Sequence, residues 1–480
     1  MVRQVCLPLY WSHSSILALY LILLYNYLIC GRKRWFASMP KRGISPIAAT
    51  AVGLGAIIGA GIFVLSGTAI AIAGADSLVA FAIVGFVALS LALQLGELGS
   101  MMPKETGASY SFVYRAFGSE LGFITGILLY FSFSTAISAV ALGFGSYAAA
   151  LFGISAHYAS AYALYIAIAA ITALALVNLQ GIKKAANIDL GLVLVKLGIL
   201  SIFIASVAMI TIGAGHISAS NFSVSAKQSG LGGIFAASIA IFFAYSGFSS
   251  ISTFTSKIKG GASSAAKAIF FSVLISIIFY VLIVLVMIIA VPASSYGVTA
   301  DPLSFVLNQI HAPASLKVIV EIGALVATAS ATLALILTSS RLIRQISKDG
   351  LLPKKFANYN RVRDTAPFGI FASSIIGVVM LFSGNIYMIA AISNFGLLFS
   401  YLLTTLALIH FRRRGQSGSF RSPFYPYLHI STIVLLLAFI FGMPKAVLEI
   451  GIIAILILIV SYYTLNEFKS GKAAKTRLFR

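Results

Sequence analysis

Long apolar runs recur along the chain after residue 45, separated by short polar or glycine-rich connections. A helix that crosses the hydrocarbon layer of a bilayer needs about 20 apolar residues, and most of the runs approach or exceed this length. Twelve runs are predicted as helices, at residues 46–73, 77–99, 119–152, 161–180, 186–213, 230–256, 264–291, 316–346, 367–384, 386–411, 424–442 and 445–465. The pattern predicts an all-α polytopic membrane protein with twelve transmembrane helices.

Glycines interrupt the first of these runs. Residues 53–63 have the sequence GLGAIIGAGIF, so four glycines fall within nine residues. Backbone amides and carbonyls need partners inside a bilayer, so a break in a helix is tolerated there only where these groups face protein, a water-filled cavity or a ligand. We therefore predict a helix interrupted at membrane depth, with Gly55 and Gly59 as break residues and a candidate site around them.

A second candidate break lies in the sixth run, at residues 242–249 with the sequence FFAYSGFS and Gly247 within it. Helices one and six are five apart and therefore cross the membrane in opposite directions. Interrupted helices at matching positions of two halves are typical of inverted-repeat transporters with a site near the midplane. The predicted repeats are residues 46–213 and 230–411, with the two helices of residues 424–465 appended. The alternative is that the glycines only let neighbouring helices pack closely.

Positive charge gathers at one face of the predicted bundle. Lysine and arginine number 33 against 11 acidic residues, although only 9% of the chain is charged and 60% is hydrophobic. If the N-terminus is inside, the outer loops hold only Lys227, Lys317 and Lys445, and the other basic residues after Met39, apart from Lys196, lie in the inner loops and in the tail of residues 466–480. Because positive charge marks cytoplasmic loops, this asymmetry predicts a multi-pass plasma membrane protein with cytoplasmic termini, and not a nucleic-acid-binding protein.

The first 38 residues do not fit this scheme. Residues 16–30 are apolar but shorter than a spanning helix, and the basic residues Arg32, Lys33 and Arg34 follow them. A signal peptide carries its positive charge before the apolar stretch, so this segment is not one. It is either an extra hydrophobic segment or the result of a mis-assigned start. We favour a start at Met39 and a single domain over residues 39–465.

The sequence offers no metal or catalytic site. Cys6 and Cys30 are the only cysteines, and the six histidines have no ligand spacing, so neither a disulfide framework nor a metal or other cofactor is predicted. A membrane-embedded acyl- or glycosyl-transferase needs clustered His, Asp or Glu at one membrane face, and the chain contains no such motif. The protein is therefore not predicted to be an enzyme.

Four motifs, in order along the chain, resemble those of the amino acid–polyamine–organocation (APC) superfamily of permeases. They are residues 55–63, GAIIGAGIF; Glu97 and Leu98 followed by Pro103 and residues 107–110, GASY; residues 243–248, FAYSGF; and Arg341 followed by residues 348–353, KDGLLP. The resemblance covers residues 41 to about 465. It implies a LeuT-type fold, in which an amino acid binds between the unwound parts of helices one and six.

In such a fold, the backbone at the two breaks holds the amino acid. The amides of Ala60 and Gly61 suit a carboxylate, because a helix N-terminus carries free amides and partial positive charge. Carbonyls of unwound segments suit an ammonium. The candidate carbonyls are those of Ile57, Phe243, Ala244 and Ser246. Tyr245 and Phe248, beside the second break, are candidates for gating the site.

Ser249 follows the second break, where many relatives carry an acid. A cationic side chain would lack its partner without that acid, so the resemblance favours a neutral amino acid over arginine, lysine or a polyamine. The following loop also departs from the family pattern. It has Ser256-Lys257 and Gly260-Gly261 in place of an acidic pair and Asn-Pro.

Lys196 lies about ten residues into the fifth predicted helix, or about 15 Å from its cytoplasmic end. This is near the centre of a hydrocarbon layer about 30 Å thick, where an ionisable side chain is a functional hypothesis by default. The resemblance implies that helix five faces helices one and eight, where sodium-coupled members hold a sodium ion. The ammonium would replace that ion, with carbonyls of residues 53–57 and the hydroxyl of Ser330 or Thr332 as its partners.

Burial favours the uncharged amine, which makes Lys196 the candidate proton carrier of a proton-coupled amino acid transporter. The alternative is a permanently charged structural lysine. An amino acid or polyamine exchanger and a nutrient receptor that does not transport are also compatible with the sequence. Glu97 and Glu321, near opposite membrane faces, are weaker candidates for a direct role.

Overall fold

The computed structural model describes residues 45–102, 109–180, 189–213, 219–222, 230–248, 258–360, 363, 365–383 and 386–478. In these residues the regular secondary structure is helical, apart from isolated bridges such as the one between Asn360 and Thr365. The segment of residues 1–38, Ser249 and the Ser256-Lys257 pair lie outside the described residues. Gly260 and Gly261 are described, and both adopt positive φ angles immediately before and at the start of a helix.

The long helices follow the predicted apolar runs. They are α2 (Pro46–Ile57), α3 (Ala60–Ala73), α4 (Ser77–Met101), α6 (Ser119–Leu151), α7 (Ala156–Leu179), α9 (Asp189–Gly213), α10 (Gly230–Tyr245), α12 (Gly261–Ala290), α14 (Ala314–Lys348), α15 (Pro367–Met380), α16 (Ile386–Arg413), α17 (Tyr427–Phe441) and α18 (Lys445–Leu478). Each of the twelve predicted ranges overlaps at least one of these helices, which confirms the all-α architecture.

Nine helical runs in the described part of the chain are long and apolar enough to cross a membrane. α3 and α4 count as one of these runs, because the 3-10 turn η1 (Gly74–Asp76) joins them. α15 and α17 are apolar but shorter, with 14 and 15 residues. The composition and these runs define a polytopic membrane protein, in which the helices pack through side chains that are apolar on most faces.

Several boundaries differ from the prediction. α7 begins at Ala156 and not at residue 161, and the predicted basic tail continues α18 as a helix to Leu478. Two short helices, α5 (Ser109–Phe117) and α13 (Pro302–Gln309), lie in connections that carry no long apolar run. Their amphipathic sequences have fewer apolar residues than a spanning segment needs, so hydropathy alone does not find them.

The first predicted helix is described as two helices. α2 ends at Ile57, α3 begins at Ala60, and Gly59 lies between them with φ −92° and ψ −145°. Gly55, predicted as part of the break, instead lies inside α2. In the sixth run, α10 ends at Tyr245 and the 3-10 turn η3 (Ser246–Phe248) follows, with Gly247 inside that turn.

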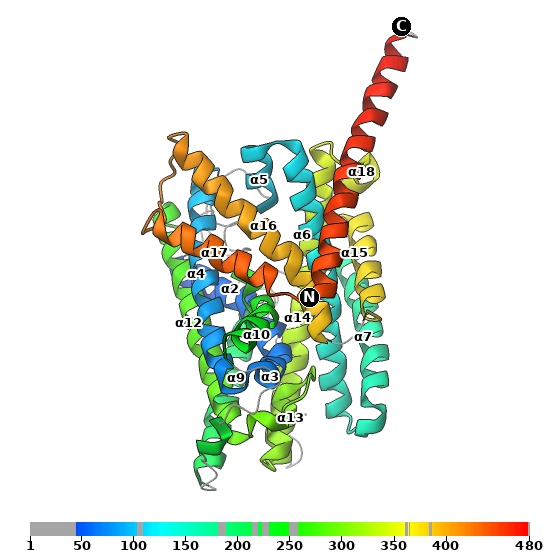
Figure 1. Ribbon diagram of the computed structural model, residues 1–480. Helices are drawn as coiled ribbons and strands as arrows, with labels where there is room; N and C mark the ends of the chain where they lie inside the picture. Colours follow the sequence, from blue (N-terminus) through cyan, green and yellow to red (C-terminus); the bar gives the residue numbers. More distant parts are fainter. Residues whose placement is uncertain are drawn as a thin grey trace, which may run out of the picture. The chain divides into compact units, whose positions relative to one another are not determined.

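The two interrupted segments lie against each other in the interior. α10 packs on α3, α4 and α16, and α12 packs on α2 and α4. α9 contacts α2, α12 and α14, and α14 also packs along α6. Figure 1 shows α2, α3 and α10 between α12 and α14, so the ends of the broken helices are enclosed by other helices.

Candidate functional site

The N-terminus of α3 presents backbone amides without a side-chain cap. Its N-cap residue is Gly59, which has no side chain to accept from the amides of the first turn. The first amides of a helix have no partner within the helix, and at α3 these belong to Ala60, Gly61 and Ile62. The predicted carboxylate donors therefore occupy the first two positions of a helix, as the sequence indicated.

A tyrosine hydroxyl bridges the carbonyl ends of the two interrupted helices. Tyr280 Oη of α12 lies 2.8 Å from the carbonyl oxygen of Ile57 and 3.0 Å from that of Ala244. Both carbonyls belong to the last turn of a helix, where a carbonyl oxygen receives no hydrogen bond from an amide of its own helix. The single hydroxyl proton is therefore shared between α2 and α10, and Tyr280 itself is fully buried.

A third predicted carbonyl also has a local donor. The Ser246 hydroxyl donates to the carbonyl of Phe243 at 2.8 Å, within the turn that follows α10. A carbonyl oxygen has two lone pairs, and both are engaged at Ile57, whose carbonyl also accepts from the Gly59 amide at 2.7 Å. The structure thus brings Ile57, Phe243, Ala244 and Ser246 to one region, where hydroxyls of the protein occupy part of their accepting capacity.

The start of α3 is in direct backbone contact with the end of α10. A methyl group at Gly61 would lie 2.3 Å from Ala244 Cα and 2.6 Å from Ala244 Cβ. Gly55 is close to α9 in the same way, since a methyl group there would lie 2.1 Å from Val193 Cγ2. Both interpretations of the glycines therefore apply: Gly59 lies in the break, whereas Gly55 and Gly61 permit close packing.

Aromatic rings surround these backbone groups. Tyr245 and Tyr280 are in edge contact with ring centroids 4.9 Å apart, and the Tyr245 hydroxyl donates to the Phe81 carbonyl of α4 at 3.3 Å. Phe248 packs on Tyr401 of α16 at 5.3 Å. Neither of the interrupted segments, residues 46–73 and 230–248, contains a charged residue. The surroundings of the breaks are therefore apolar and aromatic.

Tyr147 of α6 fixes the first turns of α3 from the other side. Its hydroxyl donates to the Phe63 carbonyl at 2.5 Å and accepts from the Leu303 amide of α13 at 3.4 Å. Near it, the Glu321 carboxylate accepts from the Ser304 hydroxyl at 3.0 Å. Burial also raises the pKa of Asp301, the residue that precedes α13. This polar cluster links α3, α6, α13 and α14 beyond the break.

Lys196 lies on the side of α9 that faces α2 and α14. Val193 of α9 contacts α2 at Gly55, and a methyl group at Gly323 of α14 would lie 2.4 Å from Ile199 Cδ1. Lys196 is midway between Val193 and Ile199, and it is 2% exposed. The predicted position between helices one and eight agrees with these contacts.

The two hydroxyls predicted beside Lys196 lie on different sides of α14. At about 100° per residue, Ser330 falls within about 20° of Gly323, whereas Thr332 falls about 180° away from it. Ser330 donates to the Ala327 carbonyl of its own helix at 3.0 Å, which leaves its oxygen able to accept. Ser330 is therefore on the side of α14 that contacts α9, and Thr332 is not.

Glu97 is part of a polar network between helices. Arg412 of α16 donates to both carboxylate oxygens of Glu97, with distances of 2.8 and 2.6 Å. The Ser422 amide and hydroxyl donate to the same carboxylate, at 2.8 and 2.6 Å, and Ser422 Oγ lies 3.1 Å from His429 Nε2 of α17. The Glu97 carboxylate thus connects α4 to α16 and to the segment before α17.

Sequence reasoning missed Tyr280 and Tyr147. The available signal was a single tyrosine within a largely apolar run, as in FFSVLISIIFYVLIVLV around Tyr280. Such a hydroxyl needs a buried partner, which that sequence does not identify. In the described residues, no group of three or more His, Cys, Asp or Glu side chains could hold a metal ion.

Comparison with known proteins identifies the class. The chain belongs to the amino acid permease family, since the family model described as Amino acid permease matches residues 44–463. It is a multi-pass plasma membrane protein of the APC superfamily, as the four motifs predicted.

Individual relatives have different substrates in their names. The chain is 29% identical over 424 residues to the methylthioribose transporter of Bacillus subtilis, covering 84% of this chain and 88% of the relative. It is 27% identical over 442 residues to the branched-chain amino acid permease BcaP of the same organism, covering 88% and 92%.

A solved structure has a similar fold. The manganese transporter mutant H236A of Eremococcus coleocola matches with a TM-score of 0.54 and 15% identity, over 87% of this chain and 93% of that one. At this identity the match concerns the fold alone, and it is consistent with a helical transporter architecture.

Proposed function

We propose that the protein carries neutral amino acids across the plasma membrane by alternating access, in symport with protons. The observation that carries this proposal is the meeting of two helix ends of opposite polarity: the uncapped N-terminus of α3 and the carbonyl end of α10, in contact at Gly61 and Ala244. An α-amino acid has a carboxylate and an ammonium on neighbouring atoms, which matches these two ends.

The binding roles follow from this polarity. The amides of Ala60 and Gly61 receive the carboxylate, and the carbonyls of Ile57 and Ala244 receive the ammonium in exchange for the Tyr280 hydroxyl. Phe243 and Ser246 supply the remaining carbonyls, and Tyr245 and Phe248 close the site. The proposed frame is twelve spanning helices with inverted repeats over residues 46–213 and 230–411 and cytoplasmic termini, in agreement with the charge distribution.

A neutral side chain fits the absence of charged residues from both interrupted segments. BcaP, whose name gives branched-chain amino acids as its substrate, supports an apolar side chain. A second candidate substrate is methylthioribose, because the methylthioribose transporter of Bacillus subtilis has about the same sequence identity to this chain as BcaP has. Methylthioribose has neither carboxylate nor ammonium, so it would leave the two helix ends without their charged partners.

Proton coupling is assigned to Lys196. A long side chain on a helix leans toward that helix's N-terminus, which directs the Lys196 ammonium along α9 toward the level of Ser330 and the carbonyls of α2. Its charge would then hold α2 against α14, and loss of the proton would release α2. In this scheme, protonation of one buried amine controls movement of the first half-helix.

Uptake by purified protein in proteoliposomes tests the function. The panel is leucine, methionine, arginine, putrescine and methylthioribose, each with an inward proton gradient in sodium-free buffer. We expect leucine or methionine to accumulate above equilibrium. Preference for arginine, putrescine or methylthioribose contradicts the proposed substrate class, and flux that requires preloaded substrate indicates exchange. Binding without accumulation indicates a receptor.

Replacement of Lys196 tests the coupling. Lys196→Ala is expected to abolish accumulation driven by the proton gradient, because the titrating amine is gone. Lys445→Ala is the matched control, since this lysine is 91% exposed and lies far along the chain at the start of α18. The control should accumulate substrate like the unaltered protein. A sodium requirement, or proton-driven uptake that survives in Lys196→Ala, contradicts the assignment.

A further inference from the structure

Four basic side chains line one pocket at the end of α14. The pocket has a volume of about 880 Å³, and its cations are Arg344, Lys348, Lys354 and Lys355. The first two belong to the last turns of α14, and the other two to the short 3-10 helix η6 (Lys354–Ala357). None of the eight lining residues is acidic. Positive charge at the cytoplasmic face explains the presence of basic residues here, but not their gathering around one hollow.

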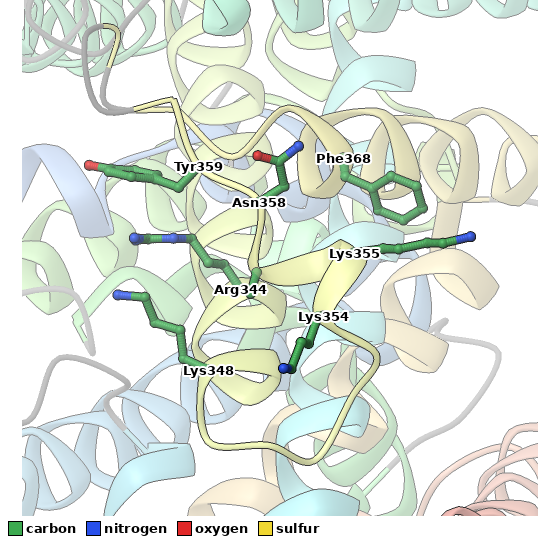
Figure 2. A pocket seen from close by; sticks show the side chains of 8 residues that line it. Arg344, Lys348, Lys354, Lys355, Asn358, Tyr359 and Phe368 are labelled. Carbon is green, nitrogen blue, oxygen red and sulfur yellow. The ribbon is translucent and has the colours of Figure 1, made fainter.

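The basic side chains extend from both sides of the pocket. Figure 2 shows Arg344 and Lys348 directed to the same side of α14, with Tyr359 above Arg344, whereas Lys355 extends beside Phe368. The Arg344 guanidinium carbon lies 3.5 Å from the centroid of the Tyr359 ring, a contact that orients the guanidinium plane. Planar guanidinium groups and lysine ammonium groups together are the usual ligands of phosphate in proteins.

The nearest acid in the sequence is directed to another helix. Asp349 follows Lys348, but its carboxylate accepts from the Tyr110 hydroxyl of α5 at 2.8 Å and from the Gln345 amide group at 3.1 Å. It is therefore committed to the contact between α5 and the end of α14. The three exposed lysines, Lys348, Lys354 and Lys355, carry like charges that a bound anion would offset.

The pocket opens onto a lipid-facing surface. Phe368 lines the pocket and also begins an exposed apolar face of α15, which continues with Phe371, Ile375 and Val379. These four side chains are 44%, 51%, 62% and 60% exposed and are spaced three or four residues apart, so they form one stripe. In a membrane-spanning helix, such a stripe contacts acyl chains. The basic pocket therefore lies at headgroup level directly above a lipid-contacting surface.

We propose that this pocket binds the phosphate of an anionic phospholipid whose acyl chains lie along the α15 stripe. A free phosphate or a soluble phosphate ester carries the same headgroup chemistry, but it would make no use of the stripe. The site is independent of the substrate and of the coupling ion, because it involves neither α2, α3, α9 nor α10.

The test compares lipid binding by the purified full-length protein and by two charge-matched variants. In the first variant, Lys348, Lys354 and Lys355 are each replaced by Gln. In the control, the exposed Arg413, Arg414 and Arg421, at the end of α16 and in the next loop, are each replaced by Gln. Phosphatidylglycerol and phosphatidylcholine with identical acyl chains are added in uncharged detergent, and bound lipid is counted by native mass spectrometry alongside the melting temperature.

We expect phosphatidylglycerol to bind and to raise the melting temperature of the unaltered protein and of the control, and phosphatidylcholine not to do so. The Lys348, Lys354 and Lys355 variant should bind phosphatidylglycerol at least tenfold more weakly. All three lysines are exposed, so folding should survive, and the single variants Lys348→Gln and Lys354→Gln should each give a smaller loss in the same direction.

Three results would overturn the proposal. The pocket variant could bind phosphatidylglycerol as well as the control does. Phosphatidylcholine could bind equally well, which would remove the role of charge. Inorganic phosphate or glycerol 3-phosphate at millimolar concentration could stabilise the protein as much as phosphatidylglycerol does, which would assign the pocket to a soluble anion.

Discussion

Tyr280 is the residue through which the two helix breaks are connected. Its hydroxyl contacts the last carbonyl of α2 and a carbonyl in the last turn of α10, both at hydrogen-bonding distance. An ammonium that binds there has three protons and can satisfy both carbonyls, whereas the hydroxyl has one. The proposed ammonium site is therefore occupied by a weaker donor of the protein itself, which a substrate has to displace.

Tyr280→Phe should lower the stability of the ligand-free protein and strengthen substrate binding. Loss of the hydroxyl removes a donor from the buried Ala244 carbonyl, whereas the Ile57 carbonyl keeps the Gly59 amide, and an unsatisfied buried acceptor costs about 1–3 kcal/mol. Removal of the competing donor should tighten leucine binding about fivefold, equivalent to about 1 kcal/mol. Thermal unfolding with and without leucine measures both effects.

Tyr296→Phe is the matched control for this change. The Tyr296 hydroxyl also donates to a buried carbonyl, that of Met287 at 2.7 Å, but it lies in the connection after α12, away from the breaks. This variant should lose stability without any change in leucine affinity. Weaker leucine binding in Tyr280→Phe would show that the hydroxyl helps to hold the substrate and does not compete with it.

At the scale of the elements, α4, α16 and α17 are held together by the Glu97 network. Glu97 is 1% exposed and its partner Arg412 14%, so the pair is largely removed from water. A second polar contact lies earlier in α4, where the Ser90 and Gln94 side chains both form hydrogen bonds with the Thr432 hydroxyl of α17. The helices appended after the predicted repeats are thereby fixed to the second helix of the first repeat.

Glu97→Gln should be strongly destabilising. Removal of one partner of a buried ion pair leaves the other charge uncompensated, at a cost of about 3–5 kcal/mol. The double variant Glu97→Gln, Arg412→Gln should lose clearly less than the sum of the two single changes. Glu449→Gln is the control, because its partner Lys445 lies 3.8 Å away and both side chains are largely exposed. Additive losses at Glu97 and Arg412 would argue against coupling between them.

The sequence predicted the elements better than the contacts between them. Hydropathy located the helices, and the glycines at 53–61 indicated the stretch in which α2 ends and α3 begins, because both signals are local. Gly55 was misassigned to the break, since the composition of the stretch does not distinguish a glycine that ends a helix from one that packs against α9. Tyr280 was missed because its partners Ile57 and Ala244 are 223 and 36 positions away.

For the molecule as a whole, the family, the membrane location and the helical architecture are established, and the proposed transport depends on the site between α3 and α10. That site is defined by two backbone ends of opposite polarity and not by charged side chains. It should therefore recognise the carboxylate and the ammonium of an amino acid together, and discriminate only weakly among apolar side chains.

The most direct measurement is calorimetric titration of the purified full-length protein with leucine and with its two truncated analogues. The first analogue, 4-methylpentanoate, lacks the amine, and the second, 3-methylbutylamine, lacks the carboxylate. Each loses hydrogen bonds to a charged group, worth about 1.5–3 kcal/mol, so both should bind at least tenfold more weakly than leucine. Equal binding of leucine and either analogue would contradict a site built from the two helix ends.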